Sequence, residues 1–153
     1  MAGKQTLDEL DRRILRGLAE NGRVSARKLG SKIGAATSTV SARMAWLERR
    51  GVIKGYAARI DYGKLGYEWV VLVEIIARKG GIREAAAKVA KLENVFAVYD
   101  LTGETDCMAV ARFKSRAELD RFVKSLQEVR GIERTITHIV LNTVKDEPDS
   151  PKP

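Results

Sequence analysis

The sequence predicts an α+β protein in which three short N-terminal helices precede a C-terminal βαββαβ unit. Apolar residues recur at helical spacing in the first third of the chain, and strand-like and helix-like segments alternate in the second half. The charge also divides along the chain. Residues 1–66 hold 14 Lys and Arg against 6 Asp and Glu, whereas residues 67–153 hold 14 of each. This segregation indicates two modules, of which the first meets a polyanion.

The first helix is expected to begin near Thr6. Thr6 and Glu9 have the spacing of a capping box, and Asp8 adds negative charge to the first turn. Asn21 and Gly22 end the helix. Its apolar residues recur at three- and four-residue intervals, which is typical of a helix with one buried face: Leu7, Leu10, Ile14 and Leu18.

Two further helices follow within the next thirty residues. Ser25 is placed to cap a second, short helix, and Gly34 ends it in the left-handed conformation that glycine adopts at low cost. A third helix is expected from about Thr37 to Arg50, with Gly51 as its stop. Two short helices joined by a tight turn and braced by a preceding helix form a helix-turn-helix module.

The helical pattern ends after Gly51. The apolar residues that follow are spaced more like a strand than a helix: Ile53, Tyr56, Ala58 and Ile60. Residues 61–67 (DYGKLGY) are rich in glycine and predict a hinge between modules. The GxxG within this stretch matches a clamp of one RNA-binding module, but no KH-like pattern flanks it, so the hinge is preferred.

The second half alternates between strand and helix. Strands are expected over residues 68–78, 95–102, 107–114 and 132–144, with helices over 82–92 and after Ser115 and Glu118, which have capping-box spacing. This order predicts a ferredoxin-like antiparallel sheet with both helices on one face. The tail, DEPDSPKP, is polar and expected to be disordered. The predicted division is a helix-turn-helix domain (1–54), a strand and hinge linker (55–67), a ferredoxin-like domain (68–145) and a tail (146–153).

Composition excludes several classes of protein. The single cysteine, Cys107, cannot form an internal disulfide, and the N-terminus lacks the apolar stretch of a signal peptide. The longest apolar runs are half of what a membrane span needs, so a soluble cytoplasmic protein is expected. Two Gln and three Asn among many Lys, Arg and Glu are typical of a thermophile. With His138 as the only histidine and no nucleophile, phosphate-loop or zinc motif, no enzyme, cofactor or metal site is expected.

Several stretches together resemble the Lrp/AsnC (feast/famine) family of transcription regulators over nearly the whole chain. They are LDELDRRIL, LGSKIGAATSTVSARMAWLERRGVIKGYAARID, and TGETD between two strands. The resemblance implies an N-terminal module that binds double-stranded DNA and a C-terminal module that dimerises and senses amino acids. Many members have Ser and Pro where this chain has Ala36 and Thr37. Thr37 or Ser38 is therefore expected to cap the third helix one position later.

The outward face of the third helix is the predicted reading surface. Its first residues are small and polar, which suits close approach to base edges in the major groove. Arg43 lies sideways and resembles the family's regular Arg, for which a phosphate contact is expected. Trp46 is expected either to pack against the first helix or the linker, or to contact DNA. The complete predicted DNA-binding set is Ser25, Arg27, Thr37, Ser38, Thr39, Ser41, Ala42, Arg43, Arg49 and Lys54.

The effector site is inferred mainly from the resemblance. Backbone amides at the Gly103 turn can hold a carboxylate, and Asp106 can hold an ammonium group. Thr135 and Thr137 alternate on one face of the last strand, which lines the ligand pocket in similar family members. Without the resemblance, TGETD would be interpreted as a plain hairpin turn.

The expected assembly is a homodimer, because one helix-turn-helix reads only one short half-site. Dimers are expected to assemble further into a homo-tetramer or homo-octamer. There are two alternative functions. An architectural DNA-binding protein would coat or bend DNA with little base preference. An RNA binder on the ferredoxin-like sheet would need surface aromatics on its central strands, and residues 107–114 offer only Phe113.

Overall fold

The computed structural model of the chain describes residues 6–146. These residues form two compact units, one built from the chain up to Arg59 with the segment that begins at Lys145, and one from Ile60 to Val144. The division between Arg59 and Ile60 falls just before the predicted hinge at residues 61–67. Residues 147–153 of the tail, for which disorder was predicted, lie outside the described residues. No helix in the described range is long and apolar enough to cross a membrane.

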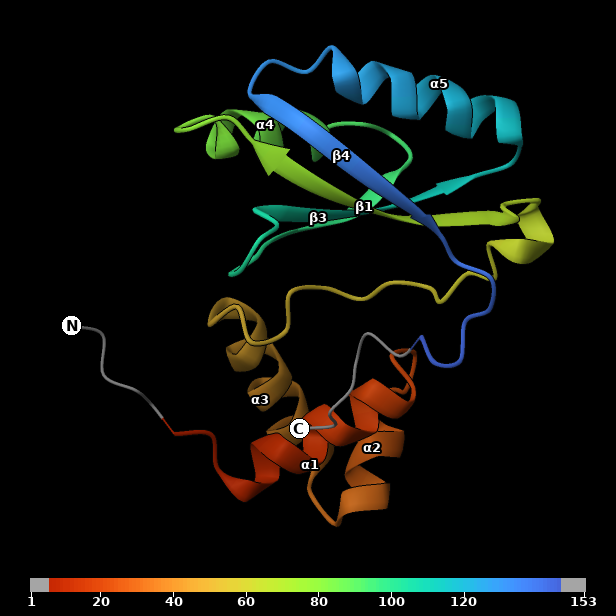
Figure 1. The fold of residues 1–153 in the computed structure, drawn as a ribbon. Helices are drawn as coiled ribbons and strands as arrows, with labels where there is room; N and C mark the ends of the chain where they lie inside the picture. The colour runs from red at the N-terminus through yellow and green to blue at the C-terminus, as the bar shows by residue number, and fades with distance from the viewer. Residues whose placement is uncertain (1–5, 147–153) are drawn as a thin grey trace. The chain divides into compact units, whose positions relative to one another are not determined.

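The first unit consists of three helices: α1 (Glu9–Glu20), α2 (Ala26–Ile33) and α3 (Thr37–Arg49) (Figure 1). These match the three helices predicted from periodicity. Each helix contributes to one small core, whose fully or almost fully buried residues are Ile14, Leu29, Ile33, Val40 and Leu47. Trp46 packs against this core and stacks with Arg50 at 5.1 Å from its ring. The packing alternative for Trp46 is therefore confirmed.

Two of the predicted helix caps were wrong. Asp8, not Thr6, caps α1, because its Oδ1 accepts a hydrogen bond from the backbone N–H of Asp11 at 2.8 Å while the Asp11 side chain accepts one from Asp8. Ala36 occupies the N-cap position of α3 and provides no side-chain bond. Thr37 already lies inside the helix, where its hydroxyl cannot act as a cap. By contrast, the predicted cap of α2 is confirmed, since Ser25 Oγ accepts from Lys28 N.

No strand forms between residues 52 and 60, although their spacing suggested one. A strand needs a partner for its backbone hydrogen bonds, and none lies beside this segment within the first unit. The side chains of Tyr56 and Ile60 are half exposed, and the hydroxyl of Tyr56 donates to Glu48 Oε1 at 2.8 Å. Burial and this contact raise the pKa of Tyr56 to about 12. The glycine-rich stretch then folds into a short 3-10 helix, η1 (Gly63–Leu65).

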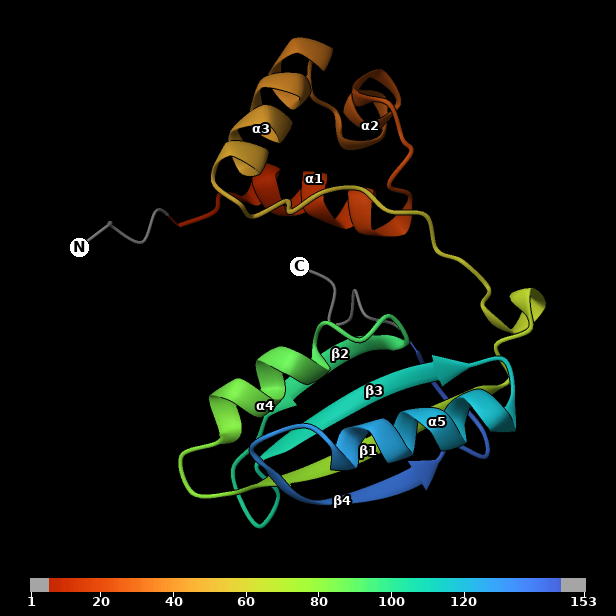
Figure 2. The same ribbon diagram turned by 90° about the horizontal axis from the view of Figure 1, so that it is seen from above.

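The second unit is a four-stranded sheet with two helices on one face (Figure 2). Its elements are β1 (Trp69–Ala77), α4 (Ile82–Val89), β2 (Val95–Asp100), β3 (Cys107–Phe113), α5 (Arg116–Gln127) and β4 (Ile132–Ile139). The strand order is β2-β3-β1-β4, and every neighbouring pair is antiparallel. The predicted ferredoxin-like arrangement is confirmed.

The last strand is shorter than predicted. β4 ends at Ile139, which pairs with Val71, and Val140 N makes the final bond to Val70 O. Because β1 begins at Trp69, residues beyond this point have no strand to pair with, and the side chain of Leu141 is 97% exposed. Apolar side chains alone were therefore a poor guide to the end of the strand.

The core of the second unit lies between the sheet and its helices. Alternate residues of β3 are fully buried there: Cys107, Ala109, Ala111 and Phe113. The small residues among them let the helices approach the sheet closely, while Phe113 packs on Phe122 of α5 with ring centroids 4.9 Å apart. The opposite, open face of the sheet carries half-exposed apolar side chains, including Leu72, Phe96, Tyr99 and Ile136.

Candidate functional site

The N-terminal turn of α3 is open to solvent. The side chains of Thr37, Ser38 and Thr39 are exposed, as are those of Ser41 and Ala42 one turn further along. Since no side chain caps this helix, its first backbone N–H groups remain available to an external acceptor. The turn therefore presents hydroxyl groups, amide donors and small side chains together on one exposed surface.

The first unit also carries exposed cations on α2, at the end of α3 and beyond it. The predicted residues Arg27, Arg49 and Lys54 are exposed, and none forms an ion pair within residues 6–146. Not every base in the module is equally available, since Lys32 Nζ lies 2.6 Å from Glu20 Oε2. Ser25, also exposed, is engaged as the cap of α2.

Arg43 has a different environment from the other predicted DNA contacts. Its Nη1 lies 2.7 Å from Asp8 Oδ2 and 3.1 Å from Asp11 Oδ1. The Asp11 side chain is almost completely buried, whereas that of Arg43 is 38% exposed. The guanidinium thus ties α3 to the start of α1 and provides the charge that a buried carboxylate needs. This structural role was missed, although two aspartates three residues apart at a helix start were a visible signal.

The same cluster perturbs the titration of Asp8. The hydrogen bond from Asp11 N lowers the pKa of Asp8, and the positive charge of Arg43 lowers it further. A carboxylate at a helix N-terminus also benefits from the helix dipole. Asp8 therefore stays ionised under conditions in which ordinary carboxylates begin to take up protons.

Gly103 and Asp106, which are predicted to hold the carboxylate and the ammonium group of an effector, lie in the turn between β2 and β3. Gly103 has φ of 118°, a backbone conformation that favours glycine. Asp106 Oδ2 accepts a hydrogen bond from the backbone N–H of Ala77 at 2.8 Å, and Asp106 N donates to Ile75 O at 3.2 Å. Asp106 thus fastens the turn to the end of β1 through one carboxylate oxygen.

The two predicted threonines lie on β4, two strands away from Asp106. Thr135 and Thr137 pair with Ile75 and Val73 of β1, so their side chains share the helix-covered face. Thr135 opens onto a hollow of ≈ 350 Å³ whose other residues are Arg78, Gln127, Ile132, Glu133 and Arg134. Neither Gly103, Asp106 nor Thr137 lines this hollow. Nothing in the sequence indicated that Arg78 and Arg134 line one hollow with Thr135, because Arg78 follows β1 whereas the other two lie on β4.

A further polar cluster lies on the open face of the sheet. Glu74 accepts hydrogen bonds from the Thr105 hydroxyl at 2.8 Å and contacts His138 Nε2 at 2.9 Å. The bond from Thr105, and then the contact with His138, lower the pKa of Glu74. Within residues 6–146, no group of three or more His, Cys, Asp or Glu side chains is arranged to hold a metal ion.

Comparison with known proteins decides the family. Residues 7–48 match the model of the AsnC-type helix-turn-helix domain, and residues 70–150 match that of the Lrp/AsnC ligand binding domain. The chain belongs to the Lrp/AsnC family. This chain therefore combines a DNA-binding helix-turn-helix domain with a ligand-binding domain. Proteins of this family are transcriptional regulators, not enzymes, and this chain is a transcriptional regulator.

The curated Lrp/AsnC relatives cover almost the whole chain. An uncharacterised HTH-type transcriptional regulator of Pyrococcus furiosus is 42% identical over 92% of this chain and 95% of its own length. The HTH-type transcriptional regulator FL11 of Pyrococcus abyssi is 34% identical over 95% of this chain and 97% of its own length. The thermophile-like composition agrees with these relatives, since Pyrococcus species are thermophilic archaea.

Solved Lrp/AsnC structures share the fold. A transcriptional regulator of Neisseria meningitidis, solved as a complex with L-Met, superposes with a TM-score of 0.90 and is 29% identical; the match covers 95% of this chain and 97% of that one. AsnC of Escherichia coli superposes with a TM-score of 0.85 at 26% identity, covering 92% and 96% of the two chains.

The Arg43 cluster gives a prediction about stability. Arg43→Met should lower the free energy of unfolding of the first unit by about 1–3 kcal/mol, because Asp11 would stay buried without its cation. Denaturant unfolding followed by circular dichroism measures this loss. Arg49→Met, which removes an exposed cation from the same helix, is the matched control. Equal stability of the two variants would contradict a structural role for Arg43.

Proposed function

We propose that this regulator binds DNA in a sequence-specific manner as an assembly of dimers, and that an amino acid changes this assembly and its DNA binding. The observation that supports DNA reading is the uncapped, exposed start of α3 in a unit that also carries exposed, unpaired cations. Phosphates supply most of the affinity in such a complex, while base edges supply the specificity. Residues of the α3 start are small enough to approach those edges closely.

The roles within the predicted DNA-binding set differ. The hydroxyl groups of Ser38 and Thr39 can contact base edges, whereas Arg27, Arg49 and Lys54 can contact phosphates. Arg43 remains a candidate phosphate contact because its side chain is partly exposed, although its guanidinium already forms ion pairs with Asp8 and Asp11. A substitution of Arg43 would therefore mix a stability effect with a binding effect, so Arg49 is the better probe of phosphate contact.

Binding measurements on the full chain test the DNA proposal. Ser38→Ala with Thr39→Ala should reduce discrimination between the preferred site and random DNA without changing the salt dependence. Arg49→Met should weaken binding to both DNAs and lower the log–log salt slope by about 0.9. A preferred site selected from a random library should bind about 10³-fold or more tightly than random DNA. A ratio near one would instead support the architectural alternative.

The open face of the sheet supports the proposed dimer. Helices cover only the other face, and Leu72, Phe96, Tyr99 and Ile136 leave apolar surface exposed around the Glu74–His138 contact. Exposed contiguous apolar surface is typical of protein–protein interfaces. A second copy placed on this face would bury it and would bring two helix-turn-helix modules to two half-sites.

A charge placed in the middle of the open face tests the dimer. Leu72→Glu should yield a folded monomer in sedimentation and should weaken binding to a two-half-site DNA far more than to a single half-site. Leu141→Glu places the same charge on an exposed side chain beyond the end of β4 and should leave the dimer intact. A Leu72→Glu variant that still sediments as a dimer would show that the copies meet elsewhere.

The proposed effector site combines the turn around Gly103 and Asp106 with Thr135 and Thr137 of β4. One oxygen of Asp106 is held by Ala77 N, so the carboxylate is fixed in place while its Oδ1 accepts no hydrogen bond within residues 6–146. Arg78 and Arg134 in the adjoining hollow add cations for a carboxylate group. Because the turn and β4 are separated by β1, a ligand that touches both needs a second wall, which a neighbouring copy can supply.

Such a shared pocket explains how an amino acid would change assembly. A ligand shifts an equilibrium only when it binds one state more tightly than the other. A pocket completed by a neighbouring copy exists only in the assembled state, so ligand binding would favour that state. The change in DNA binding would follow without any contact between ligand and DNA. The L-Met complex of the Neisseria meningitidis relative supports an amino acid as the ligand class.

Asp106→Asn tests the effector proposal without releasing the turn, because the amide oxygen can still accept from Ala77 N. This variant should bind amino acids about tenfold more weakly or worse, since it loses the charge that pairs with the ammonium group. Ligand-free DNA binding should be unchanged. Asp120→Asn, on the outer face of α5, is the control. If calorimetry detects no binding of any of the twenty amino acids at millimolar concentration, the effector proposal is wrong.

A further inference from the structure

A polar pair lies among apolar side chains on the open face of the sheet. His138 Nε2 lies 2.9 Å from Glu74 Oε1, and the side chains of the two residues are 50% and 25% exposed. In the register of β1 with β4, His138 pairs with Leu72, and Glu74 pairs with Ile136. Met108 of β3 pairs with Glu74 on its other side. The pair is thus in contact with water in one copy and would lose that water if a second copy covered the face.

The carboxylate of Glu74 is held from two sides. Its Oε2 accepts a hydrogen bond from the Thr105 hydroxyl at 2.8 Å, while its Oε1 faces His138. The bond from Thr105, and then the contact with His138, hold the pKa of Glu74 below its ordinary value, so Glu74 is ionised at neutral pH. Because Thr105 carries no charge, the imidazole alone decides the charge of the pair. That charge is zero when the imidazole is protonated and minus one when it is neutral.

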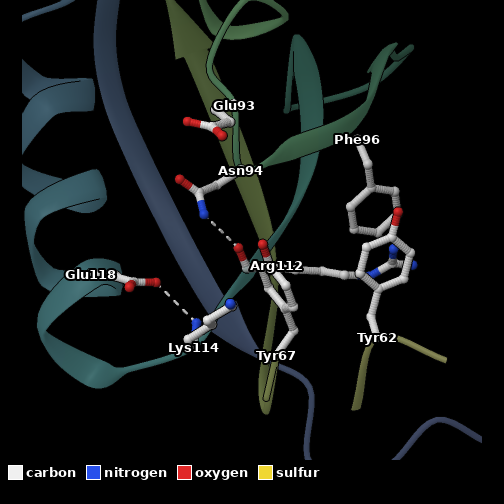
Figure 3. Close-up of a pocket in the computed structure, with 8 residues that line it drawn as sticks. All are labelled: Tyr62, Tyr67, Glu93, Asn94, Phe96, Arg112, Lys114 and Glu118. Atoms are coloured by element: carbon white, nitrogen blue, oxygen red, sulfur yellow. Dashed lines mark hydrogen bonds between the residues drawn. The ribbon is translucent and has the colours of Figure 1, made fainter. Parts of the chain in front are cut away.

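Two arginines also lie on the open face. Arg134 of β4 exerts a weaker attraction on Glu74 and forms no ion pair with it within residues 6–146. Arg112 of β3 lies four residues, or about 13 Å, along the strand from the residue that pairs with Glu74. Its guanidinium carbon lies 3.8 Å from the ring centroid of Phe96 and 4.4 Å from that of Tyr62, and Figure 3 shows Arg112 extended between these two rings. Neither arginine therefore replaces His138 as the contact of the carboxylate.

The remaining titratable groups near the pair come from β2 and from the turn before β3. β2 contributes the phenol of Tyr99, which pairs with the residue next to Glu74 in the sheet. The turn contributes the exposed Glu104 and also Asp106, whose Oδ2 is bonded to the backbone N–H of Ala77. Among the described residues, none of these groups forms a hydrogen bond or an ion pair with Glu74 or His138.

We propose that the Glu74–His138 pair makes assembly of the dimer depend on pH, with the protonated imidazole favouring the dimer. This inference rests on the proposed dimer face. Water stabilises the carboxylate charge of Glu74 in a single copy, and a covering copy would remove that water. Its removal is less unfavourable when an imidazolium lies beside the carboxylate, because the buried pair then carries no net charge. Assembly therefore draws a proton onto each His138.

The direction of the effect follows from proton linkage. A dimer that holds more protons than its two separated copies becomes stronger as the pH falls through the range in which imidazole titrates. His138 is the only histidine of the chain, and the side chains of Asp, Glu, Tyr and Lys ordinarily titrate outside pH 6–8. The dissociation constant of the dimer should therefore be about tenfold lower at pH 6 than at pH 8. Binding to a DNA with two half-sites should strengthen in the same direction.

Sedimentation equilibrium of the full chain at pH 6 and pH 8 measures this change, and three variants assign it. His138→Gln keeps a side-chain N–H donor for Glu74 but takes up no proton, so its dissociation constant should be the same at both pH values. Glu74→Gln should reverse the direction, because protonated His138 would then be buried without a carboxylate and the dimer would be weaker at pH 6. Arg134→Gln, which removes the other charge near Glu74, is the matched control and should keep the wild-type direction.

A dimer too tight to dissociate on dilution is compared by its concentration-dependent unfolding in guanidinium chloride at the two pH values. The same three variants apply, because the stability of a dimer includes the free energy of its association. The midpoint of the wild-type protein should lie at a higher guanidinium concentration at pH 6 than at pH 8, relative to that of His138→Gln under the same conditions.

Several outcomes would overturn the inference. They are a wild-type dimer that is equally strong at both pH values or stronger at pH 8, and a His138→Gln dimer that keeps the wild-type pH dependence. Leu72→Glu separates this failure from failure of the dimer proposal. If Leu72→Glu stays dimeric, the copies do not meet on the open face, and both proposals are wrong. If it is monomeric while the wild-type dimer ignores pH, the dimer face stands and only the proton-linked step is wrong.

Discussion

The four-stranded sheet depends on one constraint: its two helices can cover only one of its faces. Side chains alternate across a strand, so the residues of β3 that pack under α4 and α5 leave their neighbours Met108, Val110 and Arg112 on the other side. The open face is thus a consequence of the topology, not of a local excess of apolar residues. Every function proposed for the second unit uses a surface that this constraint leaves uncovered or only partly covered.

The same alternation divides the candidate functional residues of the second unit between its two faces. Thr135 and Thr137 share the helix-covered face with Ile75 and Val73, while the Glu74–His138 contact lies on the open face. Asp106 directly precedes β3, and β1 lies between β3 and the threonines of β4. The proposed effector site joins these positions across β1, so that proposal gives it a second wall from a neighbouring copy.

Much of the fold could be predicted from the sequence because it is encoded in periodicity. The period of 3.6 in α1 to α3 and the alternation in β1 and β3 each repeat over many residues, so single exceptions do not hide them. Caps and ends depend on one or two atoms instead. Asp8 and Thr6 are both good caps in isolation, and only the position of Asp11 decides between them. The end of β4 depends on where its partner begins.

The candidate site residues divide in the same way. The exposed start of α3 followed from helix geometry, and the structure places Ser38 and Thr39 in solvent. The environment of Arg43 did not follow, because Asp8 and Asp11 lie more than thirty residues away in the sequence. The same holds for the stacking of Arg112 on Tyr62, which joins two segments that no local pattern connects.

Charge counted from sequence therefore overstates the charge offered to DNA. Residues 23–54 hold eight bases against one acid, but Lys32 is paired with Glu20 and Arg43 with Asp8 and Asp11, whose carboxylates lie outside that stretch. Salt dependence reports the phosphates that a protein neutralises, so a cation already held by a carboxylate contributes little to it. The paired cations tie the helices of the first unit together, and the proposed phosphate contacts are left to the unpaired ones, Arg27, Arg49 and Lys54. On this proposal, different bases of the module support folding and binding.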